Sequence, residues 1–329
     1  LNALLRIDTE NEYIPFAGAY RKRGDILKEF PGAKVFPIPP MVADILWNRF
    51  HTLPIEKLIG PADVLHTSDW TEPPAAAFKV TTVHDLYPLK FPKFVYPKIR
   101  EVHKRKLYWV KKESKRIIVP SESTKADLVS LGFRENIIRV IPEAPTLTRP
   151  SDEVISGVKR KYNIREEYLI SIGVTPLKNT QRIIKAFRMA SAGKDLKLIL
   201  VGRPNNIKIG PERNVRMLGH IPQEDLAALL SGSRGLIFAS LYEGYGIPIL
   251  DAFACGVPVV TSSTGSMPEV AGSAAEIVYP TSSSSIAEGI AGIIRGSKGL
   301  VEKGNSRIKN FSWEKTAAET LEVYKEAKI

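Results

Sequence analysis

Short apolar runs alternate with longer amphipathic stretches along almost the whole chain. Runs rich in Val, Ile and Leu predict strands over 33–39, 62–68, 79–85, 116–122 and 138–144, and then over 168–173, 196–202, 215–219, 235–240, 257–262 and 275–280. The stretches between them predict helices over 41–59, 97–114, 122–131, 179–191, 223–232, 248–254, 284–296 and 312–327. Buried strands that alternate with helices are typical of α/β proteins with parallel sheets.

A segment rich in Pro and Thr separates the two series of strands. This segment, "PEAPTLTRPSDEV", indicates a linker with a hinge near residues 143–152. We therefore predict two Rossmann-like domains. Sheets of this kind bind ligands at the carboxyl ends of their strands, so two of them facing each other would enclose a cleft.

Composition excludes several classes of protein. The 329 residues contain one cysteine, Cys255, so an internal disulfide is excluded, and its apolar surroundings favour a buried filler over a nucleophile. No apolar run is long enough to span a bilayer. The chain has no zinc-type Cys/His cluster, no P-loop and no dinucleotide-binding glycine motif.

The formal net charge of +12 is concentrated in one segment. Residues 90–116 contain eleven Lys or Arg and two Glu. Three interpretations stay open for this stretch: a solvated helix face, a surface that docks on an anionic bilayer, and a nucleic-acid site. No nucleic-acid motif accompanies the charge, so we expect no nucleic-acid partner.

The segment "SLYEGYGIPILDAFACGVPVV" places two carboxylates around a glycine loop. Gly244 and Gly246 allow the backbone to approach a ligand, and the helix that follows begins with unpaired amides. Glu243 could accept hydrogen bonds from sugar hydroxyls, and Asp251, deeper on the helix, could hold a second diol. Two acids at different depths suit a ligand with two sugars, such as a nucleotide-sugar. The alternatives are a surface acid at Glu243 and a helix-capping acid at Asp251.

Polar residues also follow the other predicted strands. This group comprises His84 and Asp85, the run Ser121–Thr124, Gly173 with Lys178, Gly202 with Arg203, and Glu269. Because the carboxyl ends of parallel strands share one edge of a sheet, we expect the residues of each domain to gather there.

The chain resembles glycosyltransferase family 4 in these motifs. The resemblance is strongest in 219–260, extends over 165–327 through "LILVG" and "GSMPEVAGSAA", and is looser in "TTVHDLYPLKFP" and "VPSESTKADL". It implies the GT-B fold, with an acceptor-side domain over 1–145, a nucleotide-sugar domain over 146–311 and a helix over 312–329 that crosses back to the first domain. It also implies retaining transfer of a hexose without a bound metal or other cofactor.

The resemblance assigns roles to individual residues. Glu243 and His84 are the expected catalytic residues, both placed at the donor sugar. The expected donor-binding residues are Gly173, Lys178, Gly202, Arg203, His220, Ile221, Tyr245, Gly246, Ile247 and Asp251. On the acceptor side we expect Asp85, Ser121 and Thr124. The expected partners are a UDP- or GDP-linked sugar and a glycan or lipid-linked acceptor. The expected location is the cytoplasm, with the basic stretch 90–116 on the inner face of a membrane.

Three departures from the family pattern stand out. The second acid of the glycine loop is Asp251, where the family has Glu. The usual arginine beside Lys178 is absent, and Arg203 is the candidate substitute. The chain also begins within what would be the first helix, so we expect preceding residues, or a second chain, to add a parallel strand beside "KVTTVHD".

The resemblance also implies a mechanism, in which the acceptor attacks the front face of the sugar and the departing phosphate takes its proton. Two other functions stay open, because a fold does not fix a function. One is a non-catalytic or partial subunit that binds nucleotide-sugar, and the other is a nucleotide-sugar epimerase of the same fold.

Overall fold

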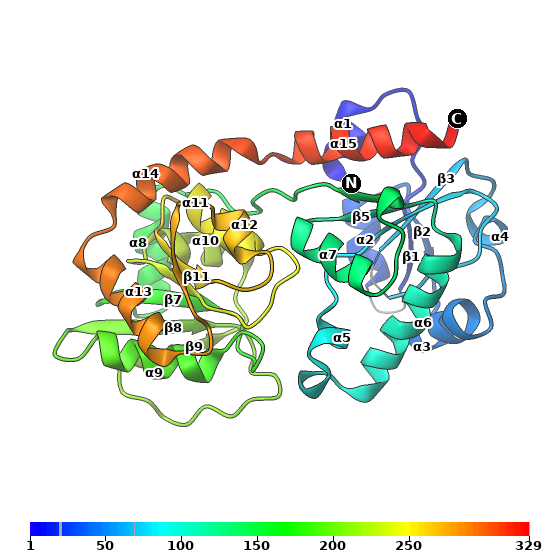
Figure 1. The fold of residues 1–329 in the computed structure, drawn as a ribbon. Helices are drawn as coiled ribbons and strands as arrows, with labels where there is room; N and C mark the ends of the chain where they lie inside the picture. Colours follow the sequence, from blue (N-terminus) through cyan, green and yellow to red (C-terminus); the bar gives the residue numbers. More distant parts are fainter. Residues whose placement is uncertain (20–21, 69, 329) are drawn as a thin grey trace. The chain divides into compact units, whose positions relative to one another are not determined.

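The computed structural model describes residues 1–19, 22–68 and 70–328 and divides into two compact units (Figure 1). The first unit comprises residues 1–120 and 124–142 together with the chain from Trp313 onward. The second unit comprises Ser121–Ser123 and Glu143–Ser312. Each unit is built around parallel β-structure, as the alternation of strands and helices predicts. Among the described residues, no helix combines the length and the apolar character that a bilayer crossing requires.

The second unit contains a six-stranded parallel sheet in the order β12-β11-β10-β7-β8-β9. Its strands are β7 (Glu167–Ile172), β8 (Leu196–Val201), β9 (Val215–Gly219), β10 (Leu236–Phe238), β11 (Val259–Ser262) and β12 (Ala275–Val278). All six coincide with predicted strands. The central strands are apolar on both sides because both faces of the sheet are covered by helices.

Two sets of helices cover this sheet (Figure 1). One face carries α9 (Thr180–Ala190) and α13 (Ser283–Arg295). The other face carries α8 (Asp152–Lys161), α10 (Gln223–Ser231), α11 (Ile247–Ala254) and α12 (Met267–Ala271). The helix α14 (Lys298–Arg307) follows α13 and packs on α11. The prediction missed α8, α12 and α14, and α8 begins inside the segment that we assigned to the linker.

The first unit contains a four-stranded parallel sheet and a separate two-stranded one. The larger sheet has the order β3 (Val64–Ser68), β4 (Phe78–Thr82), β5 (Arg116–Val119) and β6 (Ile138–Val140). The smaller sheet pairs β1 (Phe16–Gly18) with β2 (Lys34–Phe36). The helices α6 (Pro97–Glu113) and α7 (Glu122–Ser130) pack on one face of the larger sheet. The remaining short helices are α1 (Asn2–Ile7), α2 (Arg23–Glu29) and α5 (Tyr87–Lys90).

Two predictions for the first unit are wrong. The predicted helix over 41–59 is broken into α3 (Pro40–Ala43), a π-helical turn over Asp44–Arg49 and α4 (Glu56–Ile59). His51 and Leu53 have positive φ between these pieces, a conformation that a continuous helix excludes. The additional strand expected beside "KVTTVHD" also has no place there, because β4 is paired with β3 on one side and β5 on the other.

The last helix, α15 (Trp313–Lys325), belongs to the first unit. Val323 packs with Val80 and Ile118 on the face of the larger sheet that α6 and α7 leave uncovered. The Thr316 hydroxyl donates to the Pro142 carbonyl at 2.6 Å. The chain therefore completes the core of its first unit with its last helix.

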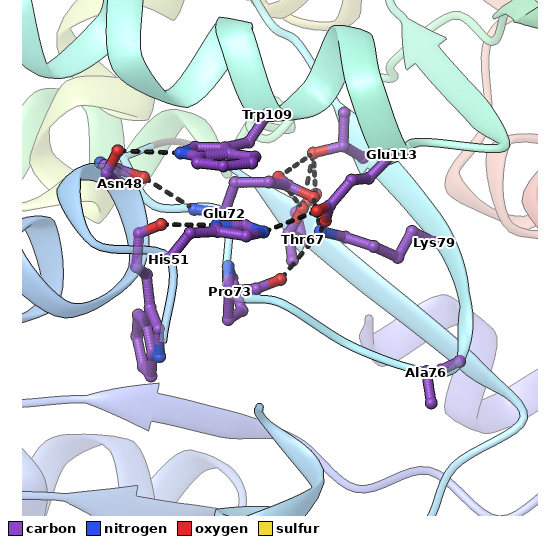
Figure 2. Close-up of polar contacts among 12 residues, drawn as sticks. Asn48, His51, Thr67, Glu72, Pro73, Ala76, Lys79, Trp109 and Glu113 are labelled. Atoms are coloured by element: carbon purple, nitrogen blue, oxygen red, sulfur yellow. Dashed lines mark hydrogen bonds and ion pairs between the residues drawn. The ribbon is translucent and has the colours of Figure 1, made fainter. Parts of the chain in front are cut away.

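A buried ionic network lies between β3, β4 and α6 (Figure 2). Glu72, which is fully buried, accepts hydrogen bonds from the hydroxyls of Thr67 at 2.7 Å and Thr81 at 3.1 Å. The Lys79 ammonium lies 3.2 Å from Glu72 and 2.7 Å from Glu113. His51 continues the network, 2.7 Å from Glu113. Sequence patterning did not single out Glu72 or Lys79. Glu72 lies in a loop and Lys79 on a strand, and neither belongs to a motif.

We predict that Lys79→Met lowers the free energy of unfolding by about 3–5 kcal/mol, because it leaves the buried Glu72 carboxylate without its cation. Urea denaturation measures this loss. Lys104→Met is the matched control. The Lys104 side chain is 51% exposed and pairs with the exposed Glu101, so its loss should cost no more than about 1 kcal/mol. Equal effects of the two substitutions would contradict a structural role for the buried pair.

Candidate functional site

The loops after β7 and β10 diverge at the point where the order of strands reverses. From β7, the chain proceeds to β8 and β9 on one side and returns to β10, β11 and β12 on the other. Neighbouring loops that run to opposite faces of a sheet leave a crevice at its carboxyl edge, the usual ligand site of such sheets. Here the loops are 173–179 after β7 and 239–246 after β10.

An ion pair joins these two loops. The Lys178 ammonium lies 2.6 Å from the Glu243 carboxylate and 4.9 Å from the centre of the Phe238 ring. Both side chains are partly exposed, Lys178 by 27% and Glu243 by 15%. A backbone hydrogen bond from Leu241 to the Leu177 carbonyl, at 2.9 Å, holds the loops at the same point. The structure thus brings together a cation and a carboxylate that lie 65 positions apart in the sequence.

Glycines make room for this arrangement. Gly173 has φ +86° and lies so close to the Lys178 stem that an added Cβ would be 2.8 Å from Cγ. Gly202, after β8, packs on the backbone of Gly173, where an added Cβ would be 3.3 Å away. Gly265, after β11, has φ +61° and would place a Cβ 2.8 Å from the Glu243 carbonyl oxygen. The backbone around Lys178 and Glu243 is therefore packed too closely for side chains at these positions.

The start of α11 follows the ion pair directly. Gly246, with φ +116°, is the residue before the helix, and Ile247 is its first residue. The first amides of a helix have no intrahelical partner and carry a partial positive charge, which suits an anion or a hydroxyl. The Ser266 hydroxyl, in the loop between β11 and α12, lies within hydrogen-bonding distance of the carbonyls of Tyr245 and Glu243 and supports this loop.

Asp251 is engaged within the second unit. Its Oδ1 accepts hydrogen bonds from the backbone amides of Thr146 at 2.6 Å and Leu147 at 2.9 Å. Burial raises the pKa of this carboxyl, and the hydrogen bonds from Thr146 and Leu147 offset only part of that effect. The expected role at a ribose stays a prediction.

The remaining donor residues lie at the same edge of the sheet. Arg203 is exposed directly after Gly202, and His220 is exposed directly after β9. Ile221 is buried in the core between the sheet and α10. Val174 lies in the turn where the family usually has an arginine, and its side chain is also buried in the core.

The acceptor-side residues follow β4 and β5. His84 is exposed, and its Nε2 lies 3.4 Å from the Ser68 hydroxyl. Asp85 accepts a hydrogen bond from the amide of Tyr87 at 3.1 Å, and Thr124 is fully buried in α7. Ser121, which belongs to the second unit, donates from its hydroxyl to the Gly244 carbonyl at 2.7 Å.

One residue of the site has no predicted role. Asn179 adopts the left-handed conformation before α9, and its side-chain amide donates to the carbonyls of Ala239 at 2.9 Å and Pro280 at 2.7 Å. It thereby ties the Lys178 loop to the loops after β10 and β12. The dipeptide Lys178-Asn179 was the available signal, because asparagine is among the few residues that tolerate this conformation.

Among the residues that the structure describes, no three His, Cys, Asp or Glu side chains come together in a group that could hold a metal ion. Transfer without a metal stays a prediction.

Both halves of the chain match sequence families of one kind. Residues 157–311 match the family described as "Glycosyl transferases group 1", and residues 16–145 match "Glycosyltransferase Family 4". The chain belongs to glycosyltransferase family 4. It is a glycosyltransferase with the GT-B fold, in agreement with what the family resemblance implies.

Two curated relatives of this glycosyltransferase are mannosyltransferases by name. The O-antigen chain mannosyltransferase B of Escherichia coli is 29% identical over 274 residues, which is 75% of this chain and 70% of the relative. The MMP alpha-(1->4)-mannosyltransferase of Mycolicibacterium hassiacum is 30% identical over 236 residues, which is 60% of this chain and 57% of the relative.

Solved structures share the fold at low sequence identity. A glycosyltransferase from Rickettsia africae superposes with a TM-score of 0.71 at 18% identity, covering 96% of this chain and 90% of that one. Anabaena HepE in complex with UDP and glucose superposes with a TM-score of 0.70 at 16% identity, covering 95% and 99%.

We predict that Gly265→Ala destabilises the glycosyltransferase by at least about 1–2 kcal/mol, the cost of a left-handed backbone in a residue with a Cβ. The added Cβ would also displace the Glu243 carbonyl. Gly299→Ala in α14 is the control, since its Cβ would meet nothing within 4 Å and alanine favours a helix by roughly 0.5–1 kcal/mol. Urea denaturation compares the two variants. Wild-type stability in Gly265→Ala would contradict the tight packing inferred here.

Proposed function

We propose that this glycosyltransferase moves a hexose from a nucleoside diphosphate sugar to a glycan or lipid-linked acceptor, with retention of configuration. The observation that carries the proposal is the Lys178–Glu243 pair, at 2.6 Å, at the switch point of the sheet in the second unit. A cation and a carboxylate in one crevice match a donor that has an anionic diphosphate and a hydroxyl-bearing sugar. The glycines beside them let such a ligand reach the backbone.

In this proposal each group has a separate task. Lys178 faces the diphosphate and stabilises the charge that develops on the leaving group. Glu243 accepts hydrogen bonds from sugar hydroxyls near the reacting carbon. The amides of Tyr245, Gly246 and Ile247 contact the sugar and phosphate from the start of α11.

The proposed step is a front-face displacement. The bond between the anomeric carbon and the phosphate oxygen breaks, and the acceptor oxygen bonds to the same face of that carbon. The departing phosphate oxygen takes the acceptor's proton, so the protein supplies orientation and charge stabilisation. Neither a metal nor another cofactor takes part, because Lys178 meets the diphosphate charge. The proposal keeps His84 as the second catalytic residue and Asp85, Ser121 and Thr124 as acceptor-side residues.

The nucleotide of the donor is UDP or GDP in this proposal. Complexes of HepE with UDP and UDP-glucose support a uridine nucleotide, and the names of the curated relatives support mannose as the sugar. The backbone near His220 and Ile221 would hold the base, with Gly173, Gly202 and Arg203 near the phosphates. Both carboxylate oxygens of Asp251 already have partners in the chain, since Oδ1 accepts the amides of Thr146 and Leu147 and Oδ2 lies 3.3 Å from the Thr146 hydroxyl.

We predict that Glu243→Gln lowers transfer about a hundredfold or more and leaves nucleotide binding nearly intact. The estimate corresponds to about 3 kcal/mol of charged hydrogen bonding in the transition state. Thermal-shift titration with UDP, GDP and their sugars measures binding, and release of the nucleoside diphosphate in the presence of an acceptor measures transfer.

Glu224→Gln, at an exposed acid in α10, is the control and should keep full turnover. Full turnover in Glu243→Gln would refute the assignment of Glu243. Nucleotide binding by the wild type without transfer to any glycan would favour the non-catalytic subunit, and conversion of the free nucleotide-sugar to an epimer would favour the epimerase.

We further propose that the first unit docks on an anionic bilayer at the cytoplasmic face of a membrane. The basic segment 90–116 contains α6, whose exposed residues include Tyr108 and Lys104. Aromatic side chains from neighbouring segments add to this surface: Phe50 is 70% exposed, and Trp70 contacts His103 of α6 edge to face, with 4.8 Å between ring centres. Exposed aromatic rings beside cations are typical of surfaces that enter the headgroup region.

A basic pocket of about 600 Å³ opens on the same surface. It is lined by Asn48, Arg49, Lys104, Arg105, Tyr108 and Trp109. Asp44 already pairs with Arg105 at 2.7 Å, and Glu101 pairs with Lys104 at 3.0 Å. Lys112 lies over the Tyr108 ring at 4.6 Å and adds a further cation to the surface. Arg49 also pairs with Asp44, at 3.5 Å. In this proposal lipid phosphates contact the lining cations in competition with Asp44 and Glu101.

We predict that phosphatidylglycerol vesicles bind the protein and that phosphatidylcholine vesicles bind it far more weakly. Lys104→Gln/Lys112→Gln should reduce the binding roughly 30-fold, because each cation contributes about 1 kcal/mol near an anionic surface. Co-sedimentation measures the bound fraction, which added salt should lower. Lys185→Gln/Lys194→Gln removes the same charge from exposed sites of the second unit and should have little effect. Equal loss in both double variants would contradict docking through this surface.

A further inference from the structure

The connector that enters the second unit is bonded to the donor-site loop. Glu143 is the first residue of this connector, and its carbonyl accepts a hydrogen bond from the Tyr245 hydroxyl at 2.8 Å. Three and four residues later, the amides of Thr146 and Leu147 both donate to Oδ1 of Asp251, at 2.6 and 2.9 Å. Tyr245 and Asp251 lie on either side of Gly246, where α11 begins. One short stretch of chain thus bears both the donor-site amides and the two anchors of the connector.

Further contacts fix the same segment. Gln223 donates to the Thr146 carbonyl at 3.2 Å, and Arg149 donates to the Ser231 carbonyl at 3.3 Å. The Leu147 side chain is buried in the core with α10 and α11. The connector is therefore held within the second unit from Glu143 to Arg149. In the contacts named here, Asp251 accepts through a carboxylate and the other acceptors are backbone carbonyls.

The Asp251 contact is the strongest candidate for an anchor. A carboxylate that accepts two backbone amides forms charge-assisted hydrogen bonds, which are stronger than bonds between neutral groups. Asp251 is only 5% exposed, so water cannot easily replace it at these amides. A buried amide that loses its acceptor is left without a hydrogen-bond partner, which costs free energy.

We propose that Asp251 is a positioning residue that holds the connector to the donor loop, so that donor binding and the order of the connector are coupled. The inference rests on the proposed donor site at Lys178, Glu243 and the start of α11. A ligand that contacts the amides at the start of α11 restrains the helix that carries Asp251. The restraint reaches Thr146 and Leu147 through two hydrogen bonds. In the reverse direction, an ordered connector favours the binding conformation of the donor loop by the same factor, which we expect to be no more than about threefold in nucleotide affinity.

This role differs from a ribose contact in what the loss of the carboxylate does. A side chain that holds the ribose contributes to nucleotide affinity directly. A side chain that holds the connector contributes to the protection of two amides and to turnover. The two roles therefore separate in one variant.

The test is Asp251→Ala with three measurements. We expect the affinity for UDP and GDP, measured by calorimetry, to stay within about threefold of the wild type. We expect hydrogen exchange at the amides of Thr146 and Leu147 to become at least about tenfold faster, and turnover to fall by at least about tenfold. In the wild type, saturating nucleotide should slow exchange at the same two amides. Asp251→Asn keeps the side-chain volume, secures a folded variant, and should give smaller changes in the same directions.

Asp225→Ala is the matched control. Asp225 is a buried acid of α10 whose carboxylate contacts Lys161 at 2.6 Å and Tyr162 at 2.7 Å rather than the amides of Thr146 and Leu147. Its loss should leave exchange at Thr146 and Leu147 unchanged.

Unchanged exchange at Thr146 and Leu147 in Asp251→Ala, together with a tenfold or greater loss of nucleotide affinity, would overturn the inference in favour of the ribose role. Exchange in the wild type that does not respond to a nucleotide that binds would overturn the coupling. If the wild type binds no nucleotide or nucleotide-sugar at all, the proposed function fails, whereas faster exchange in Asp251→Ala would still show that the carboxylate holds the connector.

Discussion

The candidate site depends on the attraction between one cation and one carboxylate at the edge of a parallel sheet. Lys178 and Glu243 come from loops that the order of strands sends to opposite faces, and their ion pair, with the Leu241–Leu177 backbone bond, keeps those loops together. Phe238 below the ammonium and the glycines beside it leave few other positions for the lysine. Because the two charges neutralise each other, neither Lys178 nor Glu243 is an isolated charge in this partly desolvated site.

Local patterns predict most of the fold for a physical reason. A buried strand of a parallel sheet is apolar throughout, and a covering helix is apolar on one side. A short window of sequence is therefore enough to predict each of them. All six strands of the second unit follow from this, as does α6. The helix over 41–59 fails because the break at His51 and Leu53 depends on packing by the distant Trp109, whose ring stacks on His51 at 3.6 Å. The contact with Trp109 has no local signature, whereas Pro54 was a local signal of a break that the prediction overlooked, because proline disfavours a helical conformation in the residue before it.

The site divides in the same way. The glycine loop, Lys178 and the strand-end positions follow from motifs and from the geometry of parallel sheets. The partners of Asp251 do not, because Thr146 lies 105 positions away in a segment that patterning describes only as a linker. The network of Glu72 and Lys79 is equally silent in sequence, since it uses ordinary residues that only the folded chain brings together. The sequence therefore predicts the functional residues that belong to local motifs, but it does not predict the long-range contacts that support them.

The place of α15 in the first unit has a consequence for how the chain folds during synthesis. Apart from Ser121–Ser123, the second unit is continuous from Glu143 to Ser312, so it can complete its core once that stretch has left the ribosome. The first unit cannot, because Val323 in its core is made after the whole of the second unit. Until then the surface of the larger sheet around Val80 and Ile118 stays uncovered, and a nascent chain exposes apolar surface of the kind that chaperones bind. The first unit is thus synthesised first but completes its core last.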